Sequence, residues 1–322
     1  MIRKILPLCF AVLVLASCKK DDPKEEVPAS SNFSCTDGNY CFARNGASSV
    51  SFSGQTTRLN QLAEMTTYMK TANNGSSVTA AQLKEMFSNN DGQGSTYFSD
   101  DASDASKQLK SKSFLGTTSQ YESWMDDFET DSQSSSPGSN GVAGVVISTS
   151  NPSKQYFFNA SGFEYTQLIE KGLMGDVFYY QAMETYIQNT LDNNYDNTTV
   201  ISGKNYTEAE HKFDEAFGYL GIGVDFPEST DGIRFHGKYC NSRDAVLGTN
   251  VIADEFYTAR AAIVDNDDPT SNVNNIKLEW HRVCAGTAIH YLNAAKNNID
   301  DDALRNHELS EAYAFIGNLL HN

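Results

Sequence analysis

The segment Tyr206 to Leu220 (YTEAEHKFDEAFGYL) places one imidazole among four carboxylates. On a helix, Glu208 precedes His211 by three residues and Glu215 follows it by four, so the three side chains share one face, and Asp214 is within reach. Imidazole and carboxylate groups at these spacings supply transition-metal ligands in helix bundles. Zinc needs at least three protein ligands, and this segment would give two or three. A second helix would complete such a site.

The same segment also fits a structural role. Its apolar stripe consists of Phe213, Ala216, Phe217 and Leu220. His211 and Asp214 lie at the border of that stripe, where a paired imidazole or carboxylate commonly joins two helices. Arg260 stands among apolar neighbours in YTARAAIVDNDD, and Asp214 or Glu215 would be its natural partner. We favour this electrostatic framework over a metal site or proton transfer, and the chain lacks the H-E-x-x-H motif of zincins.

The first eighteen residues, MIRKILPLCFAVLVLASC, have the pattern of an export signal. Arg3 and Lys4 precede an apolar run over residues 5–15 that is too short to span a bilayer. The ending LASC matches the lipobox of bacterial lipoproteins, in which the cysteine becomes the lipid-bearing N-terminus. We therefore predict that residues 1–18 are a lipoprotein signal peptide and that Cys18 anchors the protein to a membrane.

Residues 19–48 are polar and rich in serine, proline and charge, and we expect a flexible tether there. Lys19 follows the predicted lipid-bearing cysteine, so the aspartate that retains lipoproteins in the inner membrane is absent. The tract KKDDPKEE resembles the charged tract of Bacteroidetes lipoproteins that reach the outer face of the outer membrane. These features predict a cell envelope lipoprotein of the outer membrane, facing either the periplasm or the cell surface.

Four cysteines remain in the mature chain, and an oxidising compartment allows them to form disulfides. Cys35 and Cys41 flank TDGNY, whose Asp-Gly pair is a turn signal that could bring them together. Cys240 and Cys284 form either a second disulfide or two buried free thiols. The cysteine spacing does not fit a zinc site.

The 322 residues carry 41 acidic and 24 basic side chains, for a net charge of −17. Such a surface repels phosphate backbones and excludes nucleic acid as the expected partner. Apolar residues recur at three- and four-residue steps through most of the chain, and this periodicity predicts helices. The expected helices run from Thr56 to the NNGSS segment and over 78–87, 101–112, 119–129, 163–192, 206–220, 244–264, 276–297 and 300–321.

Residues 49–322 are therefore expected to form a mainly α domain, a helical bundle with a small irregular or β N-terminal part. VAGVVIS is the plausible strand after that part, with KQYFFNASG as its candidate partner. The final segment SEAYAFIGNLLHN stops inside an apolar helical pattern. Either this helix packs at the terminus or, as we expect, the natural chain continues past Asn322.

Several separated blocks resemble an uncharacterised family of bacterial lipoproteins, domain-of-unknown-function family 4856, from about Val50 onward. The blocks are SFSGQTTRLNQLAEMTTYMKTAN, IEKGLMGDVFYYQ, HKFDEAFGYLG, ARAAIVDND and AIHYLN. That family is distantly similar to imelysin-like proteins, which are helical, linked to iron uptake and sometimes called peptidases. This resemblance implies a bundle that could consist of two packed sub-bundles.

The hallmark of imelysin-like proteins is a G-x-H-x-x-E motif, and its best match here is GLMGDV, which begins at Gly172. Met174 stands in the place of the histidine and Val177 in the place of the glutamate. Neither the peptidase activity nor the metal role therefore transfers to these positions.

The leading interpretation is a lipid-anchored extracytoplasmic binding module without covalent catalysis. Its ligand is unknown, whether a small molecule, a metal or a protein, and the imelysin resemblance implies iron or haem traffic. One alternative is a metal-dependent hydrolase that uses zinc or iron at His211, Glu215 and a third ligand. Another alternative is a structural or adhesive surface lipoprotein.

Overall fold

Helices dominate the part of the chain that this computed structural model describes, residue 35 and residues 38–321. The mainly α class predicted from periodicity is confirmed. The α-helices are α1 (Ser53–Met69), α2 (Ala80–Gly92), α3 (Thr118–Ser132), α4 (Tyr165–Leu173), α5 (Gln188–Leu191), α6 (Glu208–Leu220), α7 (His236–Leu247), α8 (Ile252–Asp265), α9 (Thr270–Asn297) and α10 (Asp302–Gly317). The π-helical segments η3 (Met174–Tyr179) and η4 (Gln181–Ile187) continue α4 into α5 as one long helix. Short 3₁₀ turns are η1 (Lys70–Asn74), η2 (Lys110–Lys112), η5 (Thr249–Val251) and η6 (Asn318–Leu320).

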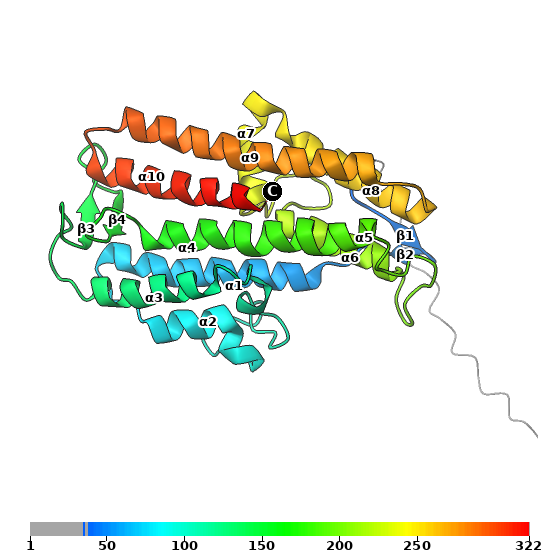
Figure 1. The fold of residues 1–322 in the computed structure, drawn as a ribbon, viewed down its shortest axis with the longest axis horizontal. Helices are drawn as coiled ribbons and strands as arrows, with labels where there is room; N and C mark the ends of the chain where they lie inside the picture. The colour runs from blue at the N-terminus through cyan, green and yellow to red at the C-terminus, as the bar shows by residue number, and fades with distance from the viewer. Residues whose placement is uncertain (1–34, 36–37, 322) are drawn as a thin grey trace, which may run out of the picture.

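The long helices lie side by side along the longest axis of the molecule (Figure 1). Helix α4 and its continuation run through the middle, in contact with α1 and α3 on one side and α10 on the other. Helix α10 packs in turn against α9, which also contacts α7 and α8. The facing apolar stripes form a continuous core in which Trp280 is the largest fully buried side chain. Burial of these stripes is the main stabilising term of such a bundle.

Two short antiparallel hairpins flank the helices. The pair β1 (Ala43–Arg44) and β2 (Ala47–Ser48) precedes α1, and β3 (Gly144–Ile147) pairs with β4 (Gln155–Phe158). The second hairpin joins the two segments VAGVVIS and KQYFFNASG, so the predicted pairing is confirmed. Within the described residues, no helix has the length and apolarity that crossing a bilayer requires.

Local sequence signals set several helix ends. Thr207 caps α6 and forms a reciprocal capping box with Glu210. Gly221 ends that helix in the left-handed conformation with a φ of 81°, which glycine adopts without a steric penalty. Thr79 caps α2 by accepting a hydrogen bond from the amide of Gln82.

The expected helix over residues 101–112 is wrong. This segment forms turns, with only the 3₁₀ turn η2 at its end. Asp104 accepts hydrogen bonds from both the amide and the hydroxyl of Ser106, at 2.9 and 2.7 Å. Such local side-chain bonds compete with the helical hydrogen-bond ladder, which explains the turn.

The expected single helix over residues 244–264 is also wrong, because α7 begins earlier and ends at Gly248, where φ is 65°. Thr249 then donates its hydroxyl proton to the carbonyl of Cys240 at 2.7 Å, and α8 starts after this turn.

The expected end of the tether needs a similar correction. Residues 38–48 pack on the bundle, and the ring of Tyr40 is only 3% exposed. The predicted signal peptide, Cys18 and the rest of the predicted tether, apart from Cys35, lie outside the described residues, as does residue 322.

Candidate functional site

The carboxylate of Asp214 lies in a buried ion pair between α6 and α8. Its Oδ1 is 2.9 Å from the Nε of Arg260, and both side chains are fully buried. The same carboxylate accepts hydrogen bonds from the hydroxyl of Tyr40 at 2.9 Å and from the amide of Ser51 at 3.1 Å. Burial raises the pKa of Asp214 to about 6, although Arg260 and the two hydrogen-bond donors oppose that shift. The sequence predicted that Arg260 pairs with Asp214 or Glu215, and in the structure the partner of these two is Asp214.

Glu210 extends this ion pair to the first hairpin. Its carboxylate accepts two hydrogen bonds from the guanidinium of Arg44, at 2.6 and 2.8 Å, in the bidentate geometry typical of arginine. The Nη1 of Arg260 lies 3.2 Å from Oε1 of the same Glu210 carboxylate. The Arg260 guanidinium also lies 4.9 Å from the ring centroid of Phe42. These contacts hold residues before α1 against α6 and α8.

The other members of the predicted cluster have separate partners. The Nδ1 of His211 lies 3.0 Å from the carbonyl of Ser51, and the imidazole stacks on the ring of Tyr206. Glu215 lies 2.7 Å from the Nζ of Lys212 and accepts a hydrogen bond from Gln55 (3.0 Å), whereas Glu208 accepts one from the amide of Asp196 (3.3 Å). Burial lowers the pKa of His211, so the imidazole is neutral near pH 7.

These side chains do not converge on one point. In the part of the chain that the structure describes, no group of three or more His, Cys, Asp or Glu side chains is arranged to hold a metal ion. The donor set of Glu208, His211, Asp214 and Glu215 therefore does not fit the zinc or iron considered from the sequence. The segment joins α6 to α8 and to the residues before α1.

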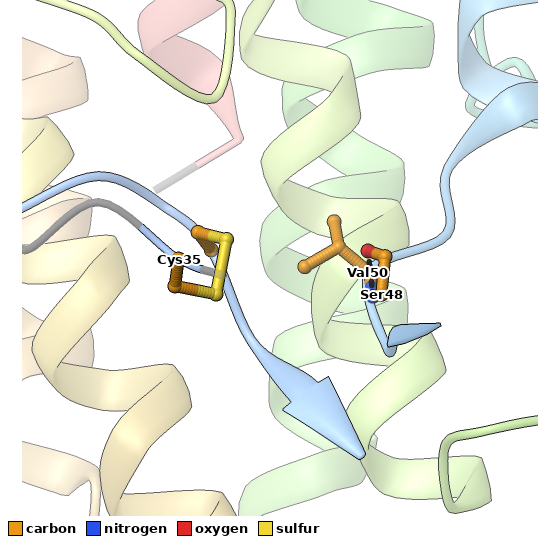
Figure 2. Close-up of a disulfide and its surroundings, with 4 residues drawn as sticks. Cys35, Ser48 and Val50 are labelled. Carbon is orange, nitrogen blue, oxygen red and sulfur yellow. Dashed lines mark hydrogen bonds between the residues drawn. A yellow bond between two sulfur atoms is a disulfide. The ribbon is translucent and has the colours of Figure 1, made fainter. Parts of the chain in front are cut away.

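The cysteines also have distinct environments. Cys35 and Cys41 are joined by a disulfide with a Cα–Cα distance of 5.3 Å, in the segment that leads into β1 (Figure 2). Cys240 and Cys284 are buried free thiols, so the second disulfide offered by the sequence is absent. The thiol of Cys240 instead donates a hydrogen bond to the carbonyl of Thr249, in the turn η5 that follows α7. Burial raises the pKa of each thiol to about 12.

A cavity of about 360 Å³ lies between α3, α4 and α10 and is a stronger candidate for a site. We call it the apolar cavity, since its walls are mainly Trp124, Leu168, Tyr313, Ile316 and Leu320. A volume of this size and a largely apolar lining are typical of small-molecule sites. The polar side chains of the lining are those of Thr117, Gln120, Tyr121, Asp176 and Asn318.

Asp176 and Tyr121 form one polar pair in the apolar cavity. The Tyr121 hydroxyl donates a hydrogen bond to Oδ2 of Asp176 at 2.6 Å, and the Nε2 of His321 contacts the other carboxylate oxygen. Burial, reinforced by the charge of Asp176, raises the pKa of Tyr121 well above its usual range, so the phenol stays protonated. Gly172 makes room for this pair, because a Cβ there would lie 2.6 Å from the Tyr121 hydroxyl.

Asn318 is the polar group of the apolar cavity whose hydrogen bonds are missing. Its side chain is part of a residue only 1% exposed, and its amide faces the thiol of Cys284, whose pKa it lowers against the effect of burial. Neither the amide nitrogen nor the amide oxygen makes a hydrogen bond of standard geometry among the described residues. The side chain packs against Gly175, where any Cβ would clash with the amide. A buried amide without partners costs about 1–3 kcal/mol, so Asn318 is a side chain of this cavity with unused hydrogen-bonding capacity.

The backbone at this cavity is also unusual. Asp176 lies in the first π-helical segment, η3, which follows α4 directly. Segments of π-helix are rare and are frequent at functional sites, where they redirect side chains. GLMGDV, the best match to the imelysin motif, spans this place, yet its Met174 and Val177 are fully buried core residues. Sequence reasoning missed Asp176, for which the four-residue step from Gly172 was the available signal.

Comparison with known proteins gives the family of the chain. Residues 37–321 match the family described as Domain of unknown function (DUF4856). The chain belongs to this family. The match includes the segment around Tyr40 that the structure packs on the bundle, and it confirms the resemblance stated from the sequence. Neither the curated proteins nor the solved structures contain a match to the chain. The relation to imelysin-like proteins stays a prediction.

Proposed function

We propose that this DUF4856 protein is a lipid-anchored binding module of the cell envelope that holds a small molecule in the apolar cavity. The unpartnered amide of Asn318 carries the proposal, because a buried donor and acceptor without partners are costly unless something binds them. The lipobox ending at Cys18 supports the anchor, and the outer membrane is the proposed location.

The lining indicates the class of ligand. Trp124 and Tyr313 offer aromatic surface, and Asn318 offers one donor and one acceptor side by side. The carboxylate of Asp176 is already engaged with Tyr121 and His321, so the cavity presents no free charge that would select a strongly charged ligand. The ligand that fits is a flat, largely apolar molecule with a neighbouring donor and acceptor, such as an aromatic carboxamide.

Tryptophan fluorescence gives a direct test, because the chain has two tryptophans and only Trp124 lines the apolar cavity. Trp280 is fully buried in the core, and Trp280→Phe leaves Trp124 as the single reporter. We expect benzamide to change its emission in a saturable way, and benzene to bind at least about tenfold more weakly because it lacks the amide.

The variant Asn318→Leu should remove the preference for benzamide over benzene. Asn293→Leu on the exposed face of α9 is the matched control and should keep the preference. Equal binding of the two probes to the parent protein, or an unchanged preference in Asn318→Leu, would refute the proposed site. Haem is added as a further probe, since the imelysin resemblance implied iron or haem; saturable haem binding that benzamide does not displace would place haem outside this cavity.

The anchor is tested separately in cells. The variant Cys18→Ser should lose incorporation of labelled palmitate and should leave the membrane fraction, whereas Cys9→Ser should keep both properties. Density separation of the membranes then gives the location, and protease treatment of intact cells distinguishes the surface from the periplasmic face. Palmitate labelling that persists in Cys18→Ser would contradict the proposed anchor.

A further inference from the structure

A second cavity, of about 370 Å³, has a different chemical character. It lies where η1 and β4 meet α4 and α10, and we call it the polar cavity. Gln167 and Lys171 of α4 line it, whereas the adjacent Leu168 and Gly172 line the apolar cavity, so the two cavities occupy different faces of one helix. The lining of the polar cavity is almost entirely charged or hydrogen-bonding.

One part of the polar cavity is a buried charge network around Glu164, whose side chain is fully buried. Its Oε2 lies 2.6 Å from the Nδ1 of His307, and its Oε1 accepts a hydrogen bond from the amide of Gln167 at 3.2 Å. The imidazole of His307 stacks on the ring of Tyr156, with centroids 4.0 Å apart. Burial lowers the pKa of His307, but the charge of Glu164 outweighs it and raises the pKa above its ordinary value.

Lys171 belongs to the same network. Its Nζ lies 2.9 Å from Oε2 of Glu170 and 3.6 Å from Oε1 of Glu311. Burial disfavours the ammonium, yet the neighbouring carboxylates raise the pKa of Lys171 well above its usual range and keep it charged. Lys171 and His307 therefore pair with Glu311 and Glu164, the two carboxylates that line the inner part of the polar cavity, while Glu170 contacts Lys171 from a neighbouring pocket.

The outer part of the polar cavity is positively charged. Lys70 and Lys154 line it with exposed side chains, and neither takes part in an ion pair among the described residues. In a chain with 41 acidic and only 24 basic residues, a pair of free lysines beside one cavity is not the average character of its surface. Both ammonium groups are available to an anionic group of a ligand.

The inner part has one unsatisfied group. Gln167 is only 3% exposed, and its Oε1 has no hydrogen-bond partner among the residues that the structure describes. This oxygen is an acceptor only, so it requires an N–H or O–H donor from outside the network. A simple carboxylate at the lysines would leave Oε1 unsatisfied, and a simple amine at Oε1 would leave the lysines unpaired.

We propose that the polar cavity binds a free α-amino acid as its zwitterion. The carboxylate of the ligand lies between Lys70 and Lys154, and its ammonium donates to Oε1 of Gln167 beside the carboxylates of Glu164 and Glu311. Each charge of the ligand then meets the opposite charge of the protein. This site is separate from the apolar cavity, and either one can fail without affecting the other.

Calorimetric titration of the whole mature protein at neutral pH tests the proposal. The probes are L-alanine, L-leucine, L-glutamate and L-lysine, with acetate and methylamine as ligands that carry only one of the two groups. We expect at least one amino acid to bind, and acetate and methylamine to bind at least about tenfold more weakly than that amino acid. Alanyl-alanine is included because a peptide separates the same two termini.

Lys70→Gln and Lys154→Gln should each weaken binding of that amino acid about tenfold, and Gln167→Met should weaken it by a similar factor. Lys296→Gln, an exposed lysine at the end of α9, is the control and should bind as the parent does. The two lysine variants change only exposed side chains, so they test the site even if the Gln167 variant fails to fold. The proposal is wrong if no amino acid binds, if acetate binds equally well, if the lysine variants bind like the parent, or if the dipeptide binds more tightly than alanine.

Discussion

The ion pair of Asp214 and Arg260 gives the sharpest prediction about stability. Arg260→Met replaces the guanidinium by an apolar side chain and leaves the carboxylate of Asp214 fully buried without its counter-charge. The hydrogen bonds from Tyr40 and Ser51 remain, but neither supplies a charge. Removing one partner of a buried pair costs about 3–5 kcal/mol of unfolding free energy. We expect a loss of that size, measured by urea denaturation followed by circular dichroism at about pH 8.

The pH dependence of the loss has a defined sign. Burial already raises the pKa of Asp214 to about 6, and Arg260 is the strongest group that opposes the rise. Without Arg260 the pKa of the folded protein rises further, whereas the pKa in the unfolded chain does not change. A folded state that binds a proton more tightly than the unfolded state gains stability as the pH falls. The cost of Arg260→Met should therefore be smaller at about pH 5 than at about pH 8.

Two further variants complete the test. Asp214→Asn combined with Arg260→Met should recover part of the lost stability, since it removes the uncompensated charge. The asparagine oxygen still accepts from the Ser51 amide, and its NH2 group can donate to the Tyr40 hydroxyl. Lys84→Met breaks the exposed pair with Asp126 and should cost less than about 1 kcal/mol. The electrostatic reasoning is refuted if Arg260→Met costs no more than this control, or if its cost is the same at both pH values.

Three further outcomes are expected. Replacing both Cys35 and Cys41 by serine should lower the unfolding free energy by about 2 kcal/mol, the chain-entropy value for so short a loop, and an unchanged denaturation midpoint would contradict this. Gly172→Ala should cost about 1–3 kcal/mol because its Cβ meets the Tyr121 hydroxyl, whereas Gly317→Ala, which faces open space, should not destabilise; equal effects in thermal denaturation would count against the packing described. Iodoacetamide at about pH 8 should not alkylate Cys240 or Cys284 in the folded protein and should alkylate both in denaturant, because burial removes access and raises both thiol pKa values; mass spectrometry that finds either one modified in the native state would disagree.

Local patterns in the sequence were enough to predict a large part of this protein. Periodicity predicted most of the helices, and two short apolar runs predicted the second hairpin. These signals act over a few residues, so they depend little on the rest of the fold. The buried partner of Arg260 was also within reach, because an arginine among apolar residues must pair with an acid and few acids lay at a helix border.

The tertiary structure alone decided where the cavities and their polar groups lie. Trp124, Asp176 and Asn318 come from three separate helical segments, and they meet only because α3 and α10 pack against the same central helix. The same packing left His211 and its carboxylates with different partners, although their spacing on one helix allowed a common ligand. Spacing fixes which side chains share a face of one helix, but whether a group finds a partner there depends on the neighbouring helices, and those contacts are not encoded in any local stretch of the chain.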